Sequence, residues 1–347
     1  ALFLCRAVSR TAQPSGAIDL GRSRATHGGM AEHPDKQPPR RVIVAGASGT
    51  IGRAVVAELV ARGAEVTALL RPGKTAPAIP ELAGAREVRV ALGDADRLAA
   101  AFAEARPDAV VSCIASRSGA PKDADLVDRQ HNLALLAAAE AAGTAHFVLL
   151  SAICVQKPLL AFQHAKLAFE ARLIASPLAH TIVRPTAFFK SLSGQVKRVK
   201  AGKPFLLFGD GELTRCKPIS DADLARFIAD CLEAPARRGA ILPIGGPGPA
   251  ISLREQGELL FAVAGKPPRF KSVSPGLFTK AEKVLALGAG VSDWFAEKAE
   301  YARIARYYAT ESMLVLDPAT GTYRADLTPE YGRESLRDHY ARLLAEG

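Results

Sequence analysis

The sequence predicts an α/β fold, a doubly wound parallel Rossmann-type sheet with a smaller C-terminal α+β substrate lobe. From Arg41 onward, short apolar segments alternate with segments of helical period, which is typical of a parallel sheet covered on both faces. The first apolar segment leads into a glycine-rich turn and then a helix. The alternation ends near Pro185. We therefore expect residues 41–190 to form the Rossmann domain and residues 191–347 the substrate lobe, partly interleaved with the sheet.

The expected elements follow one another in a regular order along the first half of the chain. The predicted strands are residues 42–45, 66–70, 87–90, 109–114, 147–151 and 181–183. The predicted helices are residues 52–62, 95–104, 126–142 and 162–175. In the second half, the segment 218–223 resembles a strand end and a capped helix, and predicts a return to the sheet. Residues 242–249 are rich in Gly and Pro and are predicted to be irregular.

Composition excludes several classes of protein. The 347 residues are 48% hydrophobic and 23% charged, which indicates a globular chain. No apolar run approaches the roughly 20 residues of a membrane-spanning helix. Cysteines at positions 5, 113, 154, 216 and 231 lack the close pairing of a metal knuckle, so no metal is expected. The net charge of +10 favours anionic ligands, but no basic patch interleaved with aromatics indicates nucleic acid.

Residues 1–40 are expected to form a disordered tail, because Ser, Thr, Pro, Gly and Arg mix there without a sustained period. Two interpretations of residues 1–29 stay open. Four arginines against one acidic residue resemble an organellar transit peptide, which would imply a plastid location. Alternatively, Met30 is the true start, and the protein is cytoplasmic and bacterial.

The pattern Gly-x-x-Gly-x-x-Gly joins the first predicted strand to the first helix. Gly46 permits a tight turn, and Gly49 lets the backbone approach a pyrophosphate. Gly52 lets the helix pack closely on the strand while the helix N-terminus faces the phosphates. This strand, turn and helix predict a dinucleotide site. The site also includes Ser48, Thr50 and Ile51.

The end of the second predicted strand selects the cofactor. An acidic residue there would bind the ribose 2′-hydroxyl of NAD, but this chain has Arg71. Arg71, Arg53 and Lys74 offer charge-assisted contacts to a 2′-phosphate, with a solvated basic loop as the alternative. We therefore predict NADPH as the cofactor.

Two further residues are candidates for cofactor contacts at the ends of strands. Asp94 follows the third predicted strand, where it either accepts a hydrogen bond from the adenine or caps the next helix. Ala115 stands at the carboxyl end of the fourth strand, the edge at which open α/β sheets bind ligands. We expect the backbone at Ala115 to line the cofactor.

The glycine motif and the strand order resemble the atypical short-chain dehydrogenase/reductase superfamily. The usual catalytic groups of that superfamily are a Ser after the fifth strand and a Tyr-x-x-x-Lys helix. Ser151 and Lys166 stand at the Ser and Lys positions, but Phe162 occupies the Tyr position. Phe162 has no acidic proton, so the acid needed for carbonyl chemistry is missing. We predict that Ser151 and Lys166 are catalytic and that Lys166 binds the nicotinamide ribose, with proton supply as its second role.

Two segments carry a more specific resemblance. Residues 149–160, LLSAICVQKPLL, and residues 307–315, YYATESMLV, are similar to divinyl chlorophyllide 8-vinyl-reductases. The likeness extends from about residue 41 to residue 337. It implies NADPH-dependent reduction of the 8-vinyl group of a divinyl chlorophyllide or protochlorophyllide to ethyl, in chlorophyll or bacteriochlorophyll synthesis. Two alternatives stay open: an NADPH-binding redox sensor or assembly factor without turnover, and an ene-reductase acting on phenolic substrates.

Aromatic and basic side chains are candidates for binding a flat, anionic tetrapyrrole. Phe162, Phe188 and Phe189 are assigned to the substrate pocket, with ordinary core packing as the alternative. A basic cluster could attract a propionate group or an anionic membrane surface, so peripheral membrane association stays open beside a solvated helix face. The cluster comprises Lys190, Lys197, Arg198, Lys200 and Lys203. No pattern specifies an oligomeric state.

Overall fold

The computed structural model describes residues 41–73, 78–288, 290 and 292–346, and its central feature is a seven-stranded parallel sheet. The strand order β3-β2-β1-β4-β5-β6-β9 confirms the predicted doubly wound Rossmann-type fold. The strands are β1 (Arg41–Ala45), β2 (Glu65–Leu70), β3 (Arg86–Arg89), β4 (Ala109–Ser112), β5 (His146–Leu150), β6 (Ala179–Pro185) and β9 (Ala240–Ile244). The predicted tail, Met30 and Lys74 lie outside the described residues.

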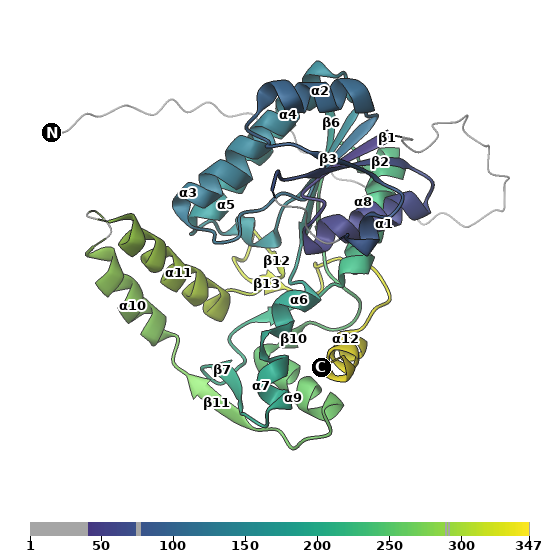
Figure 1. Cartoon of the computed structure of the whole chain (residues 1–347). Helices are drawn as coiled ribbons and strands as arrows, with labels where there is room; N and C mark the ends of the chain where they lie inside the picture. The colour runs from purple at the N-terminus through teal and green to yellow at the C-terminus, as the bar shows by residue number, and fades with distance from the viewer. Residues whose placement is uncertain (1–40, 74–77, 289, 291, 347) are drawn as a thin grey trace, which may run out of the picture. The chain divides into compact units, whose positions relative to one another are not determined.

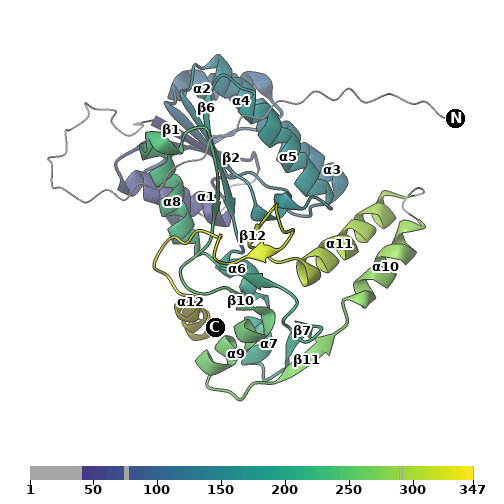
Figure 2. The same cartoon turned by 180° about the vertical axis from the view of Figure 1, so that it is seen from behind.

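Helices cover both faces of the sheet (Figures 1 and 2). Side chains alternate along β1, so Val42 and Val44 face one layer of helices while Ile43 and Ala45 face the other. The first layer is α1 (Thr50–Ala61) and α8 (Asp221–Glu233). The second layer is α2 (Ala95–Ala105), α4 (Asn132–Ala141) and α5 (Ala161–Ile174). The sheet therefore has a separate apolar core on each face.

The seventh strand, β9, includes residues 242–244, and this corrects the prediction of irregular structure there, whereas residues 245–249 form neither helix nor strand, as predicted. β9 pairs in parallel with β6. Pro243 cannot donate a ladder hydrogen bond, but β9 is an edge strand, where proline is tolerated. The predicted capped helix is confirmed, because α8 begins at Asp221 and the hydroxyl of Ser220 accepts a hydrogen bond from Asp223 N. The strand that returns to the sheet therefore follows this helix.

The first residues of the predicted helix 126–142 form a π-helix rather than an α-helix. Asp125–His131 is a π-helical segment between α3 (Pro121–Ala124) and α4, and it packs against α5. Segments of this kind are rare and frequently lie at functional sites. The segment buries Asp128 completely, next to α5.

The chain outside the sheet builds a second, smaller core (Figures 1 and 2). Two short strand pairs belong to it: β7 (Phe205–Phe208) runs parallel to β11 (Phe270–Val273), and β8 (Arg215–Cys216) runs antiparallel to β10 (Ile251–Ser252). The helices of this part are α6 (Phe189–Leu192), α7 (Val196–Lys200), α9 (Leu253–Val263) and α12 (Leu336–Ala345). Phe189, Phe205 and Tyr340 lie at the centre of the core.

A helical pair and a hairpin complete the fold. α10 (Gly276–Ala286) lies beside α11 (Asp293–Thr310), and Glu282 accepts ion pairs from Arg303 and Arg306, each at 3.2 Å. The hairpin consists of β12 (Val315–Leu316) and β13 (Tyr323–Arg324). Among the helices of the described ranges, none combines the length and the apolar character needed to cross a bilayer.

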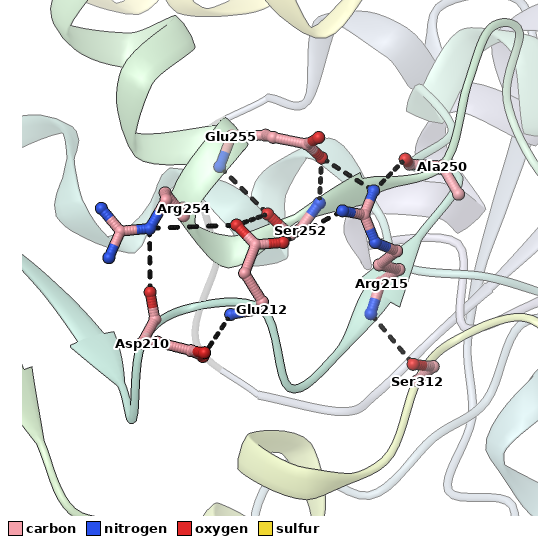
Figure 3. A network of polar contacts seen from close by, with 8 residues as sticks. All are labelled: Asp210, Glu212, Arg215, Ala250, Ser252, Arg254, Glu255 and Ser312. Atoms are coloured by element: carbon pink, nitrogen blue, oxygen red, sulfur yellow. Dashed lines mark hydrogen bonds and ion pairs between the residues drawn. The ribbon is translucent and has the colours of Figure 1, made fainter.

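An exposed polar network fixes the segment after α11 to the second core (Figure 3). The guanidinium of Arg215 binds the carboxylates of Glu212 and Glu255 at 3.0 and 3.1 Å. The backbone N–H of Arg215 donates to Ser312 Oγ, and Met313 N donates to Arg215 O, both at 2.9 Å. The other residues of this network are Asp210, Ala250, Ser252 and Arg254.

Candidate active site

The glycine turn lies directly against the end of β4. Gly46 has a φ of +77°, and a Cβ added there would lie 2.7 Å from Cys113 O. Gly49 N donates a hydrogen bond to Gly46 O at 2.9 Å and closes the turn. A Cβ on Gly52 would collide with Gly46 O. Only glycine therefore fits at positions 46 and 52, as the tight turn and the close helix packing require.

The start of α1 offers groups that fit a dinucleotide phosphate. Gly49 is the N-cap of α1, and no side chain caps that end of the helix. Ser48 and Gly49 are exposed, so the first N–H groups of the helix can meet a phosphate. Thr50 begins the helix, whereas Ile51 is buried in the sheet core. Arg53 Nε is buried without a hydrogen-bond partner among the described residues, which leaves a donor for an anionic ligand.

The basic residues predicted for the 2′-phosphate have different surroundings. Arg71 is exposed just beyond β2. Burial lowers the pKa of His131, and the charge of Arg71 lowers it further, so Arg71 lies near the π-helical segment. Arg53 Nη1 is 3.5 Å from Glu81 Oε1. The assignment of Arg71 to the 2′-phosphate stays a prediction.

Asp94 and Ala115 both lie at the carboxyl edge of the sheet. Asp94 Oδ1 accepts a hydrogen bond from Arg97 N at 3.2 Å and so caps α2, which was the alternative role for this residue. Ala115 is exposed in the loop after β4. The next residue, Ser116, donates its N–H to the carboxylate of Asp128 at 3.4 Å. This contact links the predicted cofactor loop to the π-helical segment.

Lys166 forms a buried ion pair next to that loop. Its ammonium nitrogen is 2.9 Å from Asp128 Oδ1, and the side chains are 11% and 0% exposed. The π-helical segment is held in turn by Asn132, whose amide donates to Asp128 O at 3.0 Å and whose Oδ1 accepts from Ser112 Oγ. Polar contacts therefore run from the end of β4 to α5. They hold the Lys166 ammonium in one place next to the loop after β4.

Ser151 belongs to a separate buried network. Its hydroxyl donates to Glu170 Oε1 at 2.5 Å, and Glu170 also forms an ion pair with Arg184. Glu170 is 2% exposed and lies one helical turn beyond Lys166 on α5. The contacts of Ser151 thus give it a role in holding Glu170 and Arg184 together. Its catalytic role stays a prediction.

Phe162 lies where α11 closes over the start of α5. A Cβ added to Gly119 would lie 3.0 Å from Ile304 Cδ1 and 3.3 Å from Phe162 Cδ1, so the two side chains meet over this glycine. Ala161 N donates to Glu300 Oε1 at 2.8 Å and fastens the two helices. Phe162 is half-buried, in the same apolar cluster as Cys154 and Tyr307.

The other predicted pocket residues have packing roles. Phe189 is buried in the second core, with its ring centroid 5.3 Å from that of His339. Phe188 is half-buried and packs against the sheet core. Both contacts match the alternative of ordinary core packing. Lys190, assigned to a basic surface cluster, instead donates a hydrogen bond to Thr50 Oγ1 at the first residue of α1.

Comparisons with known proteins identify the family of this chain. Residues 46–235 match the NAD(P)H-binding family. The chain is 49% identical over 319 residues to the divinyl chlorophyllide a 8-vinyl-reductase, chloroplastic, of Oryza sativa subsp. indica, covering 88% of this chain and 79% of that protein. The chain belongs to the divinyl chlorophyllide a 8-vinyl-reductase family. The family protein of Cucumis sativus is 48% identical over 320 residues, with 88% and 76% covered.

A solved structure supports the fold of this family member. The NADPH-dependent quinone oxidoreductase of Escherichia coli, in complex with NADPH, is 17% identical and has a TM-score of 0.63. The match covers 87% of this chain and 99% of the oxidoreductase. At this identity the likeness supports the fold alone. The groups of His, Cys, Asp and Glu within the described ranges include none that could hold a metal ion.

Two buried carboxylates of this vinyl-reductase family member, next to Lys166 and Ser151, were not predicted from the sequence. They are Asp128 and Glu170. A signal existed for both. Asp128 lies on the same stripe as Asn132 and Leu135, which are both buried, and Glu170 continues the four-residue spacing from Phe162 through Lys166. A carboxylate on a buried stripe needs a cationic partner, so both residues were candidates for ion pairs.

Proposed function

We propose that this chain reduces the 8-vinyl group of divinyl chlorophyllide to an ethyl group with NADPH. The observation that carries the proposal is the combination at α5: Asp128 holds Lys166 next to the loop after β4, while Phe162 replaces the usual tyrosine. A carbonyl reductase must protonate a developing alkoxide and needs an acid at that position. Hydride addition to a conjugated vinyl group spreads charge over the macrocycle, so the acid can come from elsewhere. The names of the relatives at 48–49% identity support this choice of substrate.

The residues of the chain would mainly position the reactants. The glycine turn and Arg53 would bind the pyrophosphate, and Arg71 would bind the 2′-phosphate. Lys166 would orient the nicotinamide ribose, because its ammonium is fixed by Asp128. When bound, NADPH supplies the hydride. Phe162 would offer the macrocycle an apolar surface. Holding the reacting groups in near-attack geometry can remove several kcal/mol from the barrier.

Location, membrane contact and the substrate lobe complete the proposal. The relatives are named chloroplastic, which favours a plastid location for this chain. The basic cluster gives weaker support for membrane association, because Arg198 and Lys200 donate to the backbone oxygens of Pro204 and Leu344. These contacts favour a solvated face.

We assign substrate binding to elements of residues 191–347 other than β9, which is a strand of the sheet, and α8, which covers the sheet.

A turnover assay tests the proposed function. The purified chain is incubated with NADPH and a divinyl chlorophyllide, while the absorption spectrum and product mass are followed. We expect a pigment heavier by two hydrogens. NADPH binding without turnover would instead favour the sensor or assembly-factor hypothesis. Reduction of a phenolic substrate alone would favour the ene-reductase hypothesis.

The preference for NADPH can be tested separately at Arg71. Arg71→Glu should weaken NADPH binding about tenfold to a hundredfold, because a charge-assisted contact is lost, and should affect NADH less. Fluorescence titration measures both dissociation constants. Arg172→Glu is the matched control, since Arg172 is an exposed arginine in the last turn of α5, paired with Glu140. Equal binding of both cofactors by the parent protein would contradict the assignment.

A further inference from the structure

Lys190 differs from the other lysines of the basic cluster in what its side chain contacts. It is exposed on α6, and its ammonium donates a hydrogen bond to Thr50 Oγ1, on the first residue of α1. Lys200, by contrast, donates to Leu344 O on α12. Lys190 therefore reaches from the second core to the start of the helix that follows the glycine turn.

The backbone that carries Lys190 is fixed before any ligand binds. Phe189 N donates to Ile219 O at 3.1 Å, and the Phe189 side chain is buried in the second core. Phe188, one residue earlier, packs against the sheet core and forms a β-bridge with Ile219. Because the chain is held on the sheet and on the second core, little ordering is needed to bring the Lys190 side chain to the start of α1.

The start of α1 is a positive environment, and the carboxylates near it do not pair with Lys190. A helix N-terminus carries the positive end of the helix dipole, which disfavours a cation and favours an anion. Glu81 Oε1 lies 3.5 Å from Arg53 Nη1. Burial raises the pKa of Asp221, and the charges of Lys190 and Arg53 lower it by less. Among the described residues, no carboxylate lies within ion-pair distance of the Lys190 ammonium.

We propose that Lys190 is a cofactor-binding residue, which binds the pyrophosphate of NADPH from the second core. The proposal deepens the proposed function, and it rests on the binding of NADPH but not on the choice of pigment. An ammonium has three N–H donors, and Thr50 Oγ1 accepts one of them. The other two bind phosphate oxygens at the start of α1, where Ser48 and Gly49 are exposed. A bound pyrophosphate therefore ties α6 to the glycine turn.

Lys190 and Arg71 are thereby assigned to different phosphates of one cofactor. The pyrophosphate is common to NADPH and NADH, whereas only NADPH carries the 2′-phosphate. The contact of Lys190 should therefore contribute equally to the binding of both cofactors. The contact predicted for Arg71 should contribute to NADPH alone.

The test measures cofactor binding by Lys190→Met without any pigment present. Methionine keeps most of the apolar stem and removes the charge. The dissociation constants for NADPH and NADH should both rise about tenfold, because each cofactor loses one charge-assisted contact. Adenosine 2′-monophosphate has no pyrophosphate and should bind the variant and the parent equally. The melting temperature without cofactor should match that of the parent, since Lys190 is exposed.

Two further variants serve as controls. Lys190→Arg keeps the positive charge, and its dissociation constants should stay within about threefold of those of the parent. Lys197→Met removes another exposed lysine of the basic cluster, on α7, and should leave both dissociation constants unchanged.

Three results would overturn the proposal. They are dissociation constants of Lys190→Met within about twofold of the parent, a loss of affinity confined to NADPH, or a higher KM for the pigment with unchanged cofactor binding. A parent protein that binds NADPH but leaves the vinyl group unreduced would overturn the choice of substrate and leave the assignment of Lys190 intact. The binding measurements and the turnover assay therefore separate the two failures.

Discussion

The ion pairs along α5 and the network around Arg215 use the same residue types in opposite environments. The carboxylates of Asp128 and Glu170 are almost completely buried, each with a cation beside it. In the network of Figure 3, Arg215 is 42% exposed and its partners Glu212 and Glu255 are exposed to a similar degree. Water competes for exposed pairs, whereas a buried charge that loses its partner has no substitute. The buried pairs therefore fix positions, and the exposed network adds little stability.

The largest effect is expected from breaking the Lys166 pair. Asp128→Asn removes the counter-charge and leaves a nearly buried ammonium, so the free energy of unfolding should fall by about 3–5 kcal/mol. Urea unfolding measures the change. Adding Lys166→Met should restore part of the stability, because the uncompensated charge is gone, without restoring turnover. A loss below about 1 kcal/mol for Asp128→Asn would mean that the pair behaves like an exposed one.

His146 extends the comparison to a buried group without an opposite charge. Its Nε2 is 3.0 Å from Thr181 Oγ1, whose hydroxyl donates to Arg237 O, so Nε2 carries the proton and Thr181 accepts. Nδ1 is buried without a partner among the described residues. Burial, together with the charges of Arg238 and His180, lowers the pKa of His146 from 6.5 to about 4.

This shift predicts a loss of stability in mild acid. Between pH 6.5 and about pH 4, His146 binds a proton in the unfolded chain but not in the folded chain. The folded state therefore keeps its full stability above pH 6.5 and loses stability as the pH falls toward 4. The decline should reach about 3 kcal/mol at most. Unfolding curves at a series of pH values, compared with those of His146→Gln, measure it. The same slope in both proteins would exclude His146 as the cause.

The smallest effect is expected in the exposed network. Arg215→Ala removes the contacts to Glu212 and Glu255 but should cost only about 0–1 kcal/mol, because water replaces the exposed partners. The cost should shrink further in about 1 M salt. A salt-independent loss above about 2 kcal/mol would show that this network behaves like the buried pairs.

Most of the fold and part of the site could be predicted from the sequence. The features that could not be predicted share a physical cause. Apolar periodicity and glycine spacing are local, so they predicted β1 to β6, α1 and the turn at Gly46. Pro243 suppressed the prediction of β9, because only the finished sheet shows that this strand lies at an edge. The π-helical pitch that buries Asp128 against Lys166 also depends on packing between distant segments.

The most direct test of the central claim follows the hydride. NADPH labelled with deuterium at its transferable position is supplied with divinyl chlorophyllide, and the product is analysed by mass spectrometry and nuclear magnetic resonance. Direct transfer predicts one deuterium at the terminal carbon of the new ethyl group, with the hydrogen at the inner carbon coming from solvent. An ethyl group formed without the label would contradict hydride transfer from NADPH to the vinyl group.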